Sequence, residues 1–277
     1  MAKELCIAHA NCQGEPLIQR LLACPAFAER YEVRLVTNYV KEPMPEDALG
    51  RCSLFLYQHL GAKWGDLASE RLLERLRPDA RSLCIPNMFF KGYWPFWSGE
   101  PGFDYRCTHL DEFIDKGLPP EETVMLFLRS DVARLHDLDA LAEASVEHER
   151  AREAHTPVKY VDEIVAGYGD EQLFNTVNHP KARLMNHAAA GVLKELEFEP
   201  PGQAALEALG EPFPEFEQPV NPKVAEHFGW EFGLASREYE VYGKKMGFAM
   251  YAANYIVARQ AGVTDFIGFL QGANGEG

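Results

Sequence analysis

The 277-residue sequence has few basic residues, no closely spaced cysteine pair and no long hydrophobic run, and each absence excludes a class of protein. With 27 Lys and Arg against 42 Asp and Glu, the formal net charge is −15. Such a charge repels phosphate backbones and anionic lipids, which argues against nucleic-acid and membrane-surface partners. An anionic cofactor would need a local basic pocket.

Metal, disulfide and membrane signatures are also missing. The six cysteines, at positions 6, 12, 24, 52, 84 and 107, include no C-x-x-C pair and no zinc-like spacing. No His, Asp or Glu pair has recognisable ligand spacing either, so no metal site is predicted. The most apolar helical stretch, 246–258, is shorter than the ~20 residues needed to span a bilayer. The N-terminus lacks the apolar core of a signal peptide, and the sequence predicts a cytoplasmic protein without a transmembrane segment.

What is present is a composition of 47% hydrophobic and 12% aromatic residues, enough for a full core. Short segments at 5–10, 32–37, 53–57 and 81–85 predict strands, and the helical periodicity of 16–23 and 66–76 predicts helices between them. This order predicts a mostly parallel sheet with helices on both faces. The strand at 32–37 alternates polar and apolar residues, which places it near a sheet edge.

After an aromatic loop at 89–103, the remaining sequence is mainly helical. Helices are expected at 121–135, 138–153, 158–174, 181–196 and 237–261, the last interrupted or kinked near Gly243 and Gly247. The stretch 200–222 holds six prolines and is expected to be extended, and the tail 272–277 to be frayed. We expect one domain, 1–277, with an α/β core over about 1–128 and a mainly helical part over about 129–277.

Polar residues follow three of the expected strands, at 9–13, 58–60 and 86–90. Because ligands bind at the carboxyl ends of parallel strands, this rim is the predicted site. Gln58, His59 and Asn87 are therefore expected as polar supports, and His9 as a cofactor-positioning residue.

Cys12 is the most distinctive candidate for a functional residue at that rim. It follows the first strand, and Pro16 then fixes φ for the first turn of a helix. A helix N-terminus favours the thiolate form, and Gly14 lets the backbone approach a ligand. The amides of residues 12 to 14, including those of Gln13 and Gly14, are candidate oxyanion donors. The alternative is that Cys12 only fills the turn.

His179 is the second feature, because Pro180 holds the preceding residue in an extended conformation at a loop-to-helix junction. A histidine there is well placed for proton transfer, although a capping or surface role is the alternative. His9 and His59 are rivals for the same role. In so acidic a chain, Lys181 and Arg183 are the candidates for binding cofactor phosphates, with Lys91 and Arg129 as alternates.

Several short motifs together resemble the WcbI-type polysaccharide-biosynthesis family over roughly residues 4–195. They are N-C-Q-G at 11–14, Y-Q at 57–58, I-P at 85–86, F-F-x-G-Y-x-P at 89–95 and N-H-P at 178–180. The resemblance implies a coenzyme A-binding acetyltransferase that acts on a hydroxyl of capsular or cell-surface sugars. It further implies Cys12 as nucleophile and His179 as base, with Asn11 and Gln58 as polar supports.

The layout also resembles the SGNH hydrolases, so the expected fold is SGNH-hydrolase or flavodoxin-like. Those enzymes have an aspartate three residues before the histidine, where this chain has Thr176. Asn175, Asn178 or Asp162 are the candidates for the missing orienting group. Three alternatives stay open: an esterase or thioesterase using water, direct attack by the acceptor without a covalent step, and a non-catalytic CoA- or nucleotide-binding protein. The sequence does not indicate the acceptor or the oligomeric state.

Overall fold

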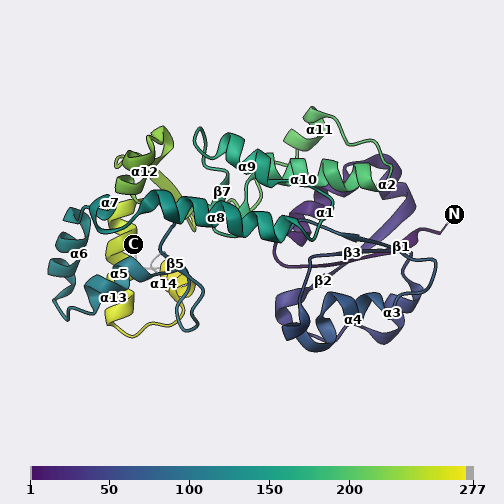
Figure 1. Ribbon diagram of the computed structural model, residues 1–277, viewed down its shortest axis with the longest axis horizontal. Helices are drawn as coiled ribbons and strands as arrows, with labels where there is room; N and C mark the ends of the chain where they lie inside the picture. The colour runs from purple at the N-terminus through teal and green to yellow at the C-terminus, as the bar shows by residue number, and fades with distance from the viewer. Residues whose placement is uncertain (1, 273–277) are drawn as a thin grey trace. The chain divides into compact units, whose positions relative to one another are not determined.

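The computed structural model describes residues 2–272, and the chain forms two compact units, each assembled from separate stretches (Figure 1). The first unit comprises Met1–Phe89, His148–Ala166 and Asn178–Pro212. The second comprises Phe90–Glu147, Gly167–Val177 and Phe213–Gly277. A single domain divided near residue 128 stays a prediction.

A four-stranded parallel sheet in the order β2-β1-β3-β4 is the centre of the first unit. Its strands are β1 (Glu4–Ala10), β2 (Tyr31–Thr37), β3 (Leu54–Tyr57) and β4 (Arg81–Cys84). The predicted parallel sheet is confirmed, with β2 at an edge. The chain moves from β1 to β2 on one side and then returns to β3 on the other. In open α/β sheets, ligands bind at such a reversal, beyond the carboxyl ends of the two central strands.

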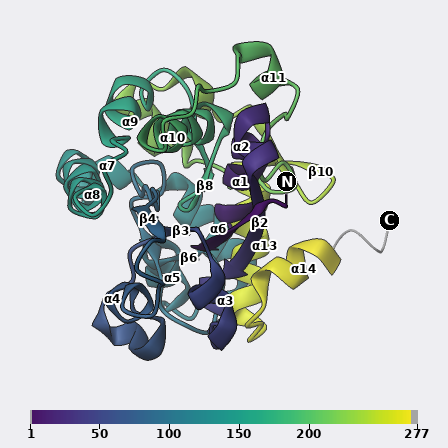
Figure 2. The ribbon, with the colours of Figure 1, turned by 90° about the vertical axis from the view of Figure 1, so that its right-hand side faces the viewer.

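Helices cover both faces of this sheet (Figures 1 and 2). One face carries α1 (Gly14–Leu22), α2 (Pro25–Arg30), α10 (Ala182–Glu195) and α11 (Gln203–Glu207), and the other carries α3 (Glu46–Arg51) and α4 (Ser69–Leu73). Further elements of this unit are η1 (Asn38–Val40), η2 (Ala62–Leu67), β8 (His179–Pro180), most of α9 (Val161–Gly167) and the end of α8 (Leu138–Glu153).

Strand alternation divides the buried side chains of the sheet between these two faces. Ile7 and Phe55, paired across β1 and β3, pack with Leu49 and Leu72 on the α3–α4 side. On the other face, a Cβ at Gly14 would lie 2.9 Å from Ala10 Cβ and 2.6 Å from Leu35 Cδ1. Glycine is therefore required for α1 to begin directly against the sheet, which is a packing reason beside the expected ligand approach.

The second unit is mainly helical. Its helices are α5 (Thr108–Ile114), α6 (Pro120–Arg129), α7 (Val132–Leu135), the greater part of α8, α12 (Pro222–Phe228), η3 (Glu231–Gly233), α13 (Phe248–Gln260) and α14 (Phe266–Gly272). Its strands are β5 (Trp97–Ser98), β6 (Arg106–Cys107), β7 (Phe174–Thr176), β9 (Glu238–Val241) and β10 (Lys244–Gly247), and β5–β6 and β9–β10 pair antiparallel.

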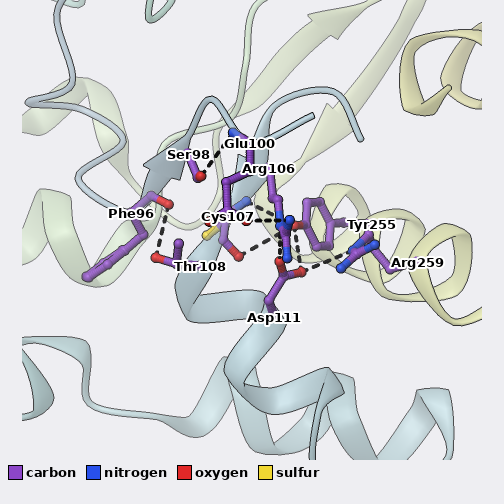
Figure 3. A network of polar contacts seen from close by, with 9 residues as sticks. All are labelled: Phe96, Ser98, Glu100, Arg106, Cys107, Thr108, Asp111, Tyr255 and Arg259. Atoms are coloured by element: carbon purple, nitrogen blue, oxygen red, sulfur yellow. Dashed lines mark hydrogen bonds and ion pairs between the residues drawn. The ribbon is translucent and has the colours of Figure 1, made fainter. Parts of the chain in front are cut away.

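A buried carboxylate joins α5 to α13 in this unit (Figure 3). Asp111 Oδ2 accepts a hydrogen bond from Arg106 Nε at 2.5 Å. Asp111 Oδ1 accepts from Tyr255 OH at 3.0 Å and from Arg259 Nε at 3.1 Å. Because a buried charge is stable only when it is paired and hydrogen-bonded, this network fixes the position of α5.

The structure corrects several expected elements. The helix expected at 237–261 is wrong over residues 237–247, where β9 and β10 form a hairpin. Tyr242 and Gly243 both have positive φ, 49° and 84°, which suits the two-residue turn of a hairpin and not a helix. The helix expected at 158–174 is reduced to α9, and Phe174, the last residue of the expected helix, begins β7.

Other boundaries shift less. The helix at 66–76 shortens to η2 and α4, and the one at 121–135 is divided into α6 and α7. Helices α2 and α3 were not predicted, and α11 interrupts the proline-rich stretch. Gly272 ends α14, whereas the rest of the expected frayed tail lies outside the described residues. Over residues 2–272, no helix has the length and apolarity to cross a membrane.

Candidate functional site

Cys12 lies at the tip of a tight turn between β1 and α1. The Gly14 amide donates to Asn11 O at 2.9 Å, and the Gln13 amide donates to Asn11 Oδ1 at 2.9 Å. Two of the three amides expected to bind an oxyanion are thus hydrogen-bonded within the turn. The turn is held rigid, and Cys12 is left half-buried.

Asn11 and Gln58 join the carboxyl ends of β1 and β3. Gln58 Oε1 accepts from the Asn11 amide at 2.8 Å, and Gln58 Nε2 donates to Asn11 Oδ1 at 3.2 Å. Gln58 Nε2 also donates to Pro86 O at 3.1 Å, and Asn11 Nδ2 donates to Asn87 Oδ1 at 3.2 Å. The structure therefore brings together three polar residues expected at the rim, Asn11, Gln58 and Asn87.

Gln13 holds two more segments against this turn. Its side chain is buried, and it donates to Met88 O at 2.7 Å and accepts from the Met88 amide at 3.1 Å. It also donates to Asn178 O at 2.9 Å. The side chain of Gln13 therefore binds protein main chain.

The loop containing Asn178 and His179 reaches the cysteine. Asn178 Nδ2 donates to Cys12 Sγ at 3.7 Å, a normal length for a hydrogen bond to sulfur. His179 is the next residue, and burial lowers its pKa to about 4. The imidazole is therefore neutral at neutral pH, which is the form that accepts a proton.

The other candidates for an orienting group lie differently. Asn175 Nδ2 donates to Phe213 O at 2.9 Å in the second unit. Asp162 is largely exposed and pairs with Arg150 at 2.6 Å. Of the three candidates, Asn178 donates to Cys12 Sγ.

His9 faces the α3–α4 side of the sheet. It is 1% exposed, its ring stacks on Phe55 with centroids 6.4 Å apart, and neither ring nitrogen has a hydrogen-bond partner among residues 2–272. Burial lowers its pKa to about 4. The expected cofactor-positioning residue is thus outside the hydrogen-bonded network around Cys12.

This placement predicts an effect on acid stability. The pKa of His9 is 6.5 in the unfolded chain and about 4 in the folded protein. The free energy of unfolding is therefore at its full value above pH 6.5, and it decreases as the pH falls toward 4. At pH 5 the loss from this residue is about 2 kcal/mol. His9→Leu should reduce the difference in unfolding free energy between pH 8 and pH 5 by that amount in urea titrations. The control variant His227→Leu, at a surface position beside Asp139, should leave this difference unchanged. An equal pH dependence of the wild type and both variants would contradict the prediction.

His59 lines a separate cleft of about 260 Å³ beside Asn87. Its ring stacks on His155 with centroids 3.7 Å apart. Arg152, also in the cleft lining, donates to Asn87 O at 3.0 Å and pairs with Glu149 at 3.3 Å. Glu149 in turn accepts from the Phe89 amide at 2.9 Å, and burial raises its pKa to about 7. These two residues hold the segment after β4, and sequence reasoning missed both.

A basic pocket of about 1200 Å³ lies in the same unit. Its charged lining consists of four cations and two acids: Lys41, Lys63, Arg71, Arg75, Asp66 and Glu74. Trp64 is also in the lining, with Lys41 Nζ 5.6 Å from its ring. Lys41 follows η1, whose Asn38 donates to Gln58 Oε1 at 3.4 Å, so the pocket adjoins the carboxyl edge of the sheet. The cluster of basic residues around Trp64 was the available sequence signal, and it was missed.

The basic residues expected to bind phosphate lie elsewhere. Arg183 pairs with Glu163 at 2.7 Å, and Lys181 directly precedes α10. Lys91 lies over the Trp97 ring at 5.2 Å in the second unit.

Comparison with known proteins gives two matches. The family model described as polysaccharide biosynthesis enzyme WcbI matches residues 5–201, which include all the motifs noted in the sequence. A solved structure of WcbI, described as a novel polysaccharide biosynthesis enzyme in native form without a disulfide bond between coenzyme A and one of its cysteines, is similar with a TM-score of 0.78. The two are 20% identical, and the match covers 99% of this chain and 96% of that one. No curated protein matches the chain.

Proposed function

Because the chain belongs to the WcbI family of polysaccharide biosynthesis enzymes, we propose that it transfers an acetyl group from acetyl-CoA to a hydroxyl of a sugar or polysaccharide precursor. The observation that carries this proposal is the contact of Asn178 Nδ2 with Cys12 Sγ. It joins a cysteine at the carboxyl end of β1 to the loop that contains His179. A nucleophile at a strand end, followed by a helix and beside an Asn-His loop, supports a mechanism of acyl transfer by a nucleophile and a base.

The first step is attack of the Cys12 thiolate on the thioester carbon. A new carbon–sulfur bond forms, the bond to the CoA sulfur breaks, and the CoA thiolate leaves with the electron pair. Neutral His179 takes the thiol proton of Cys12 and gives it to this leaving sulfur. In the second step the acceptor hydroxyl attacks the acetyl group on Cys12 and gives its proton to His179. The ester product leaves, and the cysteine regains its proton.

Asn178 is the proposed donor to the oxyanion. The amides of Gln13 and Gly14 already have acceptors in the turn, whereas Asn178 Nδ2 points at the sulfur that carries the reacting carbon. A side-chain amide can supply such a hydrogen bond, and its value in a preorganised site is about 3 kcal/mol.

The basic pocket is the proposed site for the nucleotide end of CoA. In a chain of net charge −15, phosphates bind where cations are concentrated, and four of them line this pocket. Trp64 offers a ring on which adenine can stack. The solved neighbour is described in relation to CoA and one of its cysteines. In this chain we assign Cys12 to the position beside the CoA sulfur.

Intact-protein mass spectrometry after incubation with acetyl-CoA and acid quenching tests the covalent step. We expect one acetyl group per chain, on the peptide that contains Cys12, with one equivalent of CoA released. Continued release without an acceptor would indicate the esterase or thioesterase alternative. Binding of CoA with neither adduct nor release would contradict the covalent mechanism and favour direct attack or a non-catalytic protein.

A further inference from the structure

Three residues with metal-binding side chains lie together in the second unit, outside the site around Cys12. His109 and Glu112 belong to α5, and His136 directly follows α7. Their ligand atoms lie within 4.8 Å of one another. His109 Nδ1 is 3.1 Å from His136 Nε2 and 3.4 Å from Glu112 Oε2. With metal–ligand bonds of about 2.0–2.1 Å, two ligands of a tetrahedral zinc ion are about 3.3 Å apart. Both distances match that spacing.

The hydrogen bonds around His109 direct a lone pair toward this point. Ser130 Oγ donates to Phe127 O at 2.6 Å, so its oxygen is left to accept from His109 Nε2 at 3.4 Å. The proton of the neutral ring is thereby assigned to Nε2, and Nδ1 carries the lone pair. This lone pair faces the Glu112 carboxylate. A metal-bound histidine with its other nitrogen held by an oxygen acceptor is the usual arrangement.

His109 is buried among aromatic rings. The residue is 1% exposed, and the rings of Phe96, Phe113 and Phe127 lie with centroids 5.0, 5.2 and 5.5 Å from its own. A neutral imidazole nitrogen 3.4 Å from a carboxylate oxygen places two acceptors face to face. His136 can donate a proton to only one of them, whereas a cation satisfies both.

The ligands also lie on a rigid base. Asp111, between His109 and Glu112 on α5, is held by Arg106, Tyr255 and Arg259 (Figure 3). The position of α5 is thus fixed independently of any metal, and Glu112, with 57% of its side chain exposed, can adjust to complete the site.

We propose that His109, Glu112 and His136 bind one divalent cation of the zinc class. Two imidazole nitrogens and one carboxylate suit Zn²⁺, Co²⁺ or Ni²⁺ better than Mg²⁺ or Ca²⁺, which prefer oxygen ligands. Three protein ligands leave a fourth position for water or an oxygen of a bound molecule. The sequence predicted no metal site, because His136 is 24 residues beyond Glu112 and only the fold brings it near.

Calorimetric titration of the chelator-treated full chain with ZnCl₂ tests this proposal. We expect wild-type protein to bind one equivalent, and the affinity to fall about tenfold or more in His136→Ala and in Glu112→Gln. Co²⁺ added in place of Zn²⁺ should produce visible absorption bands in the wild type that both variants lose. His109 is not substituted, because its buried ring also supports the core.

The matched control is His227→Ala. His227 is a partly exposed histidine of the same unit that pairs with the carboxylate of Asp139 at 3.0 Å. This variant should bind zinc as the wild type does, and zinc should raise the unfolding temperature of both by more than that of His136→Ala. No zinc binding at millimolar metal, or equal binding by all variants, would overturn the proposal and leave His109 and His136 as a hydrogen-bonded pair.

Discussion

Cys12→Ser should lower the rate of CoA release from acetyl-CoA on the order of a thousandfold or more, because serine is a far weaker nucleophile at neutral pH. The substitution keeps the size of the side chain and lets it accept from Asn178 Nδ2. The affinity for CoA should therefore change only a few fold. Release is measured with a thiol reagent in single-turnover experiments, and affinity by calorimetry.

Cys24→Ser is the control for this change. Cys24 is buried, and its Sγ donates to Glu199 O at 3.3 Å, a hydrogen bond that serine can also make. This variant should release CoA at the wild-type rate. Should Cys12→Ser keep nearly full activity instead, Cys12 has no covalent role, and attack by the acceptor with His179 as base becomes the better explanation.

Reversal of two charges in the basic pocket should weaken CoA binding about a hundredfold. Lys63 and Arg71 line the pocket, and each hydrogen bond to a charged phosphate contributes about 1.5 kcal/mol or more. In the double variant Lys63→Glu, Arg71→Glu the two contacts are lost and like charges face the ligand. Calorimetry with CoA and with dephospho-CoA measures the loss and shows whether the 3′-phosphate lies in this pocket.

Two comparison variants separate this pocket from the positions that the sequence suggested. Arg183→Glu should leave CoA affinity close to wild type, because that guanidinium already pairs with Glu163. Lys194→Glu, on the surface of α10, controls for the change in net charge that Arg183→Glu makes. A loss in Arg183→Glu with no loss in the double variant would place the phosphates beside His179 instead.

The strands of the sheet could be predicted because each is a short segment, either apolar or alternating, that ends in a turn or loop. The convergence of Asn11, Gln58 and Asn87 then followed from one rule, that parallel strands present their carboxyl ends at the same edge. No knowledge of side-chain packing was needed for either step.

The hairpin of β9 and β10 was missed although its signal was present. Tyr239 and Val241 are buried and alternate with two glutamates, and Gly243 lies in the turn. The alternation is only four residues long, and the strong helix that begins at Phe248 extended the helical prediction backwards. A short strand is missed in this way when the helical periodicity of a neighbouring segment dominates the stretch of sequence over which periodicity is judged.

The supports contributed by α8 could not be predicted at all. Glu149 binds the Phe89 amide across 60 positions in the sequence, and Arg152 binds Asn87 across 65. On a helix that also has exposed acids and bases, these two charges have no local feature that marks them as buried or paired. Only tertiary packing brings them to the segment after β4.

The side chain of Gln13 has a consequence for how the protein is made. It donates to Asn178, which is synthesised 165 residues later. At a ribosomal rate of about 5–20 residues per second, Cys12 leaves the ribosome roughly 10 to 30 seconds before the segment that completes its surroundings. Throughout that interval the thiol lacks its contact with Asn178, and the nascent first unit also lacks α10. The newborn chain therefore exposes this thiol before the loop that contacts it has been made.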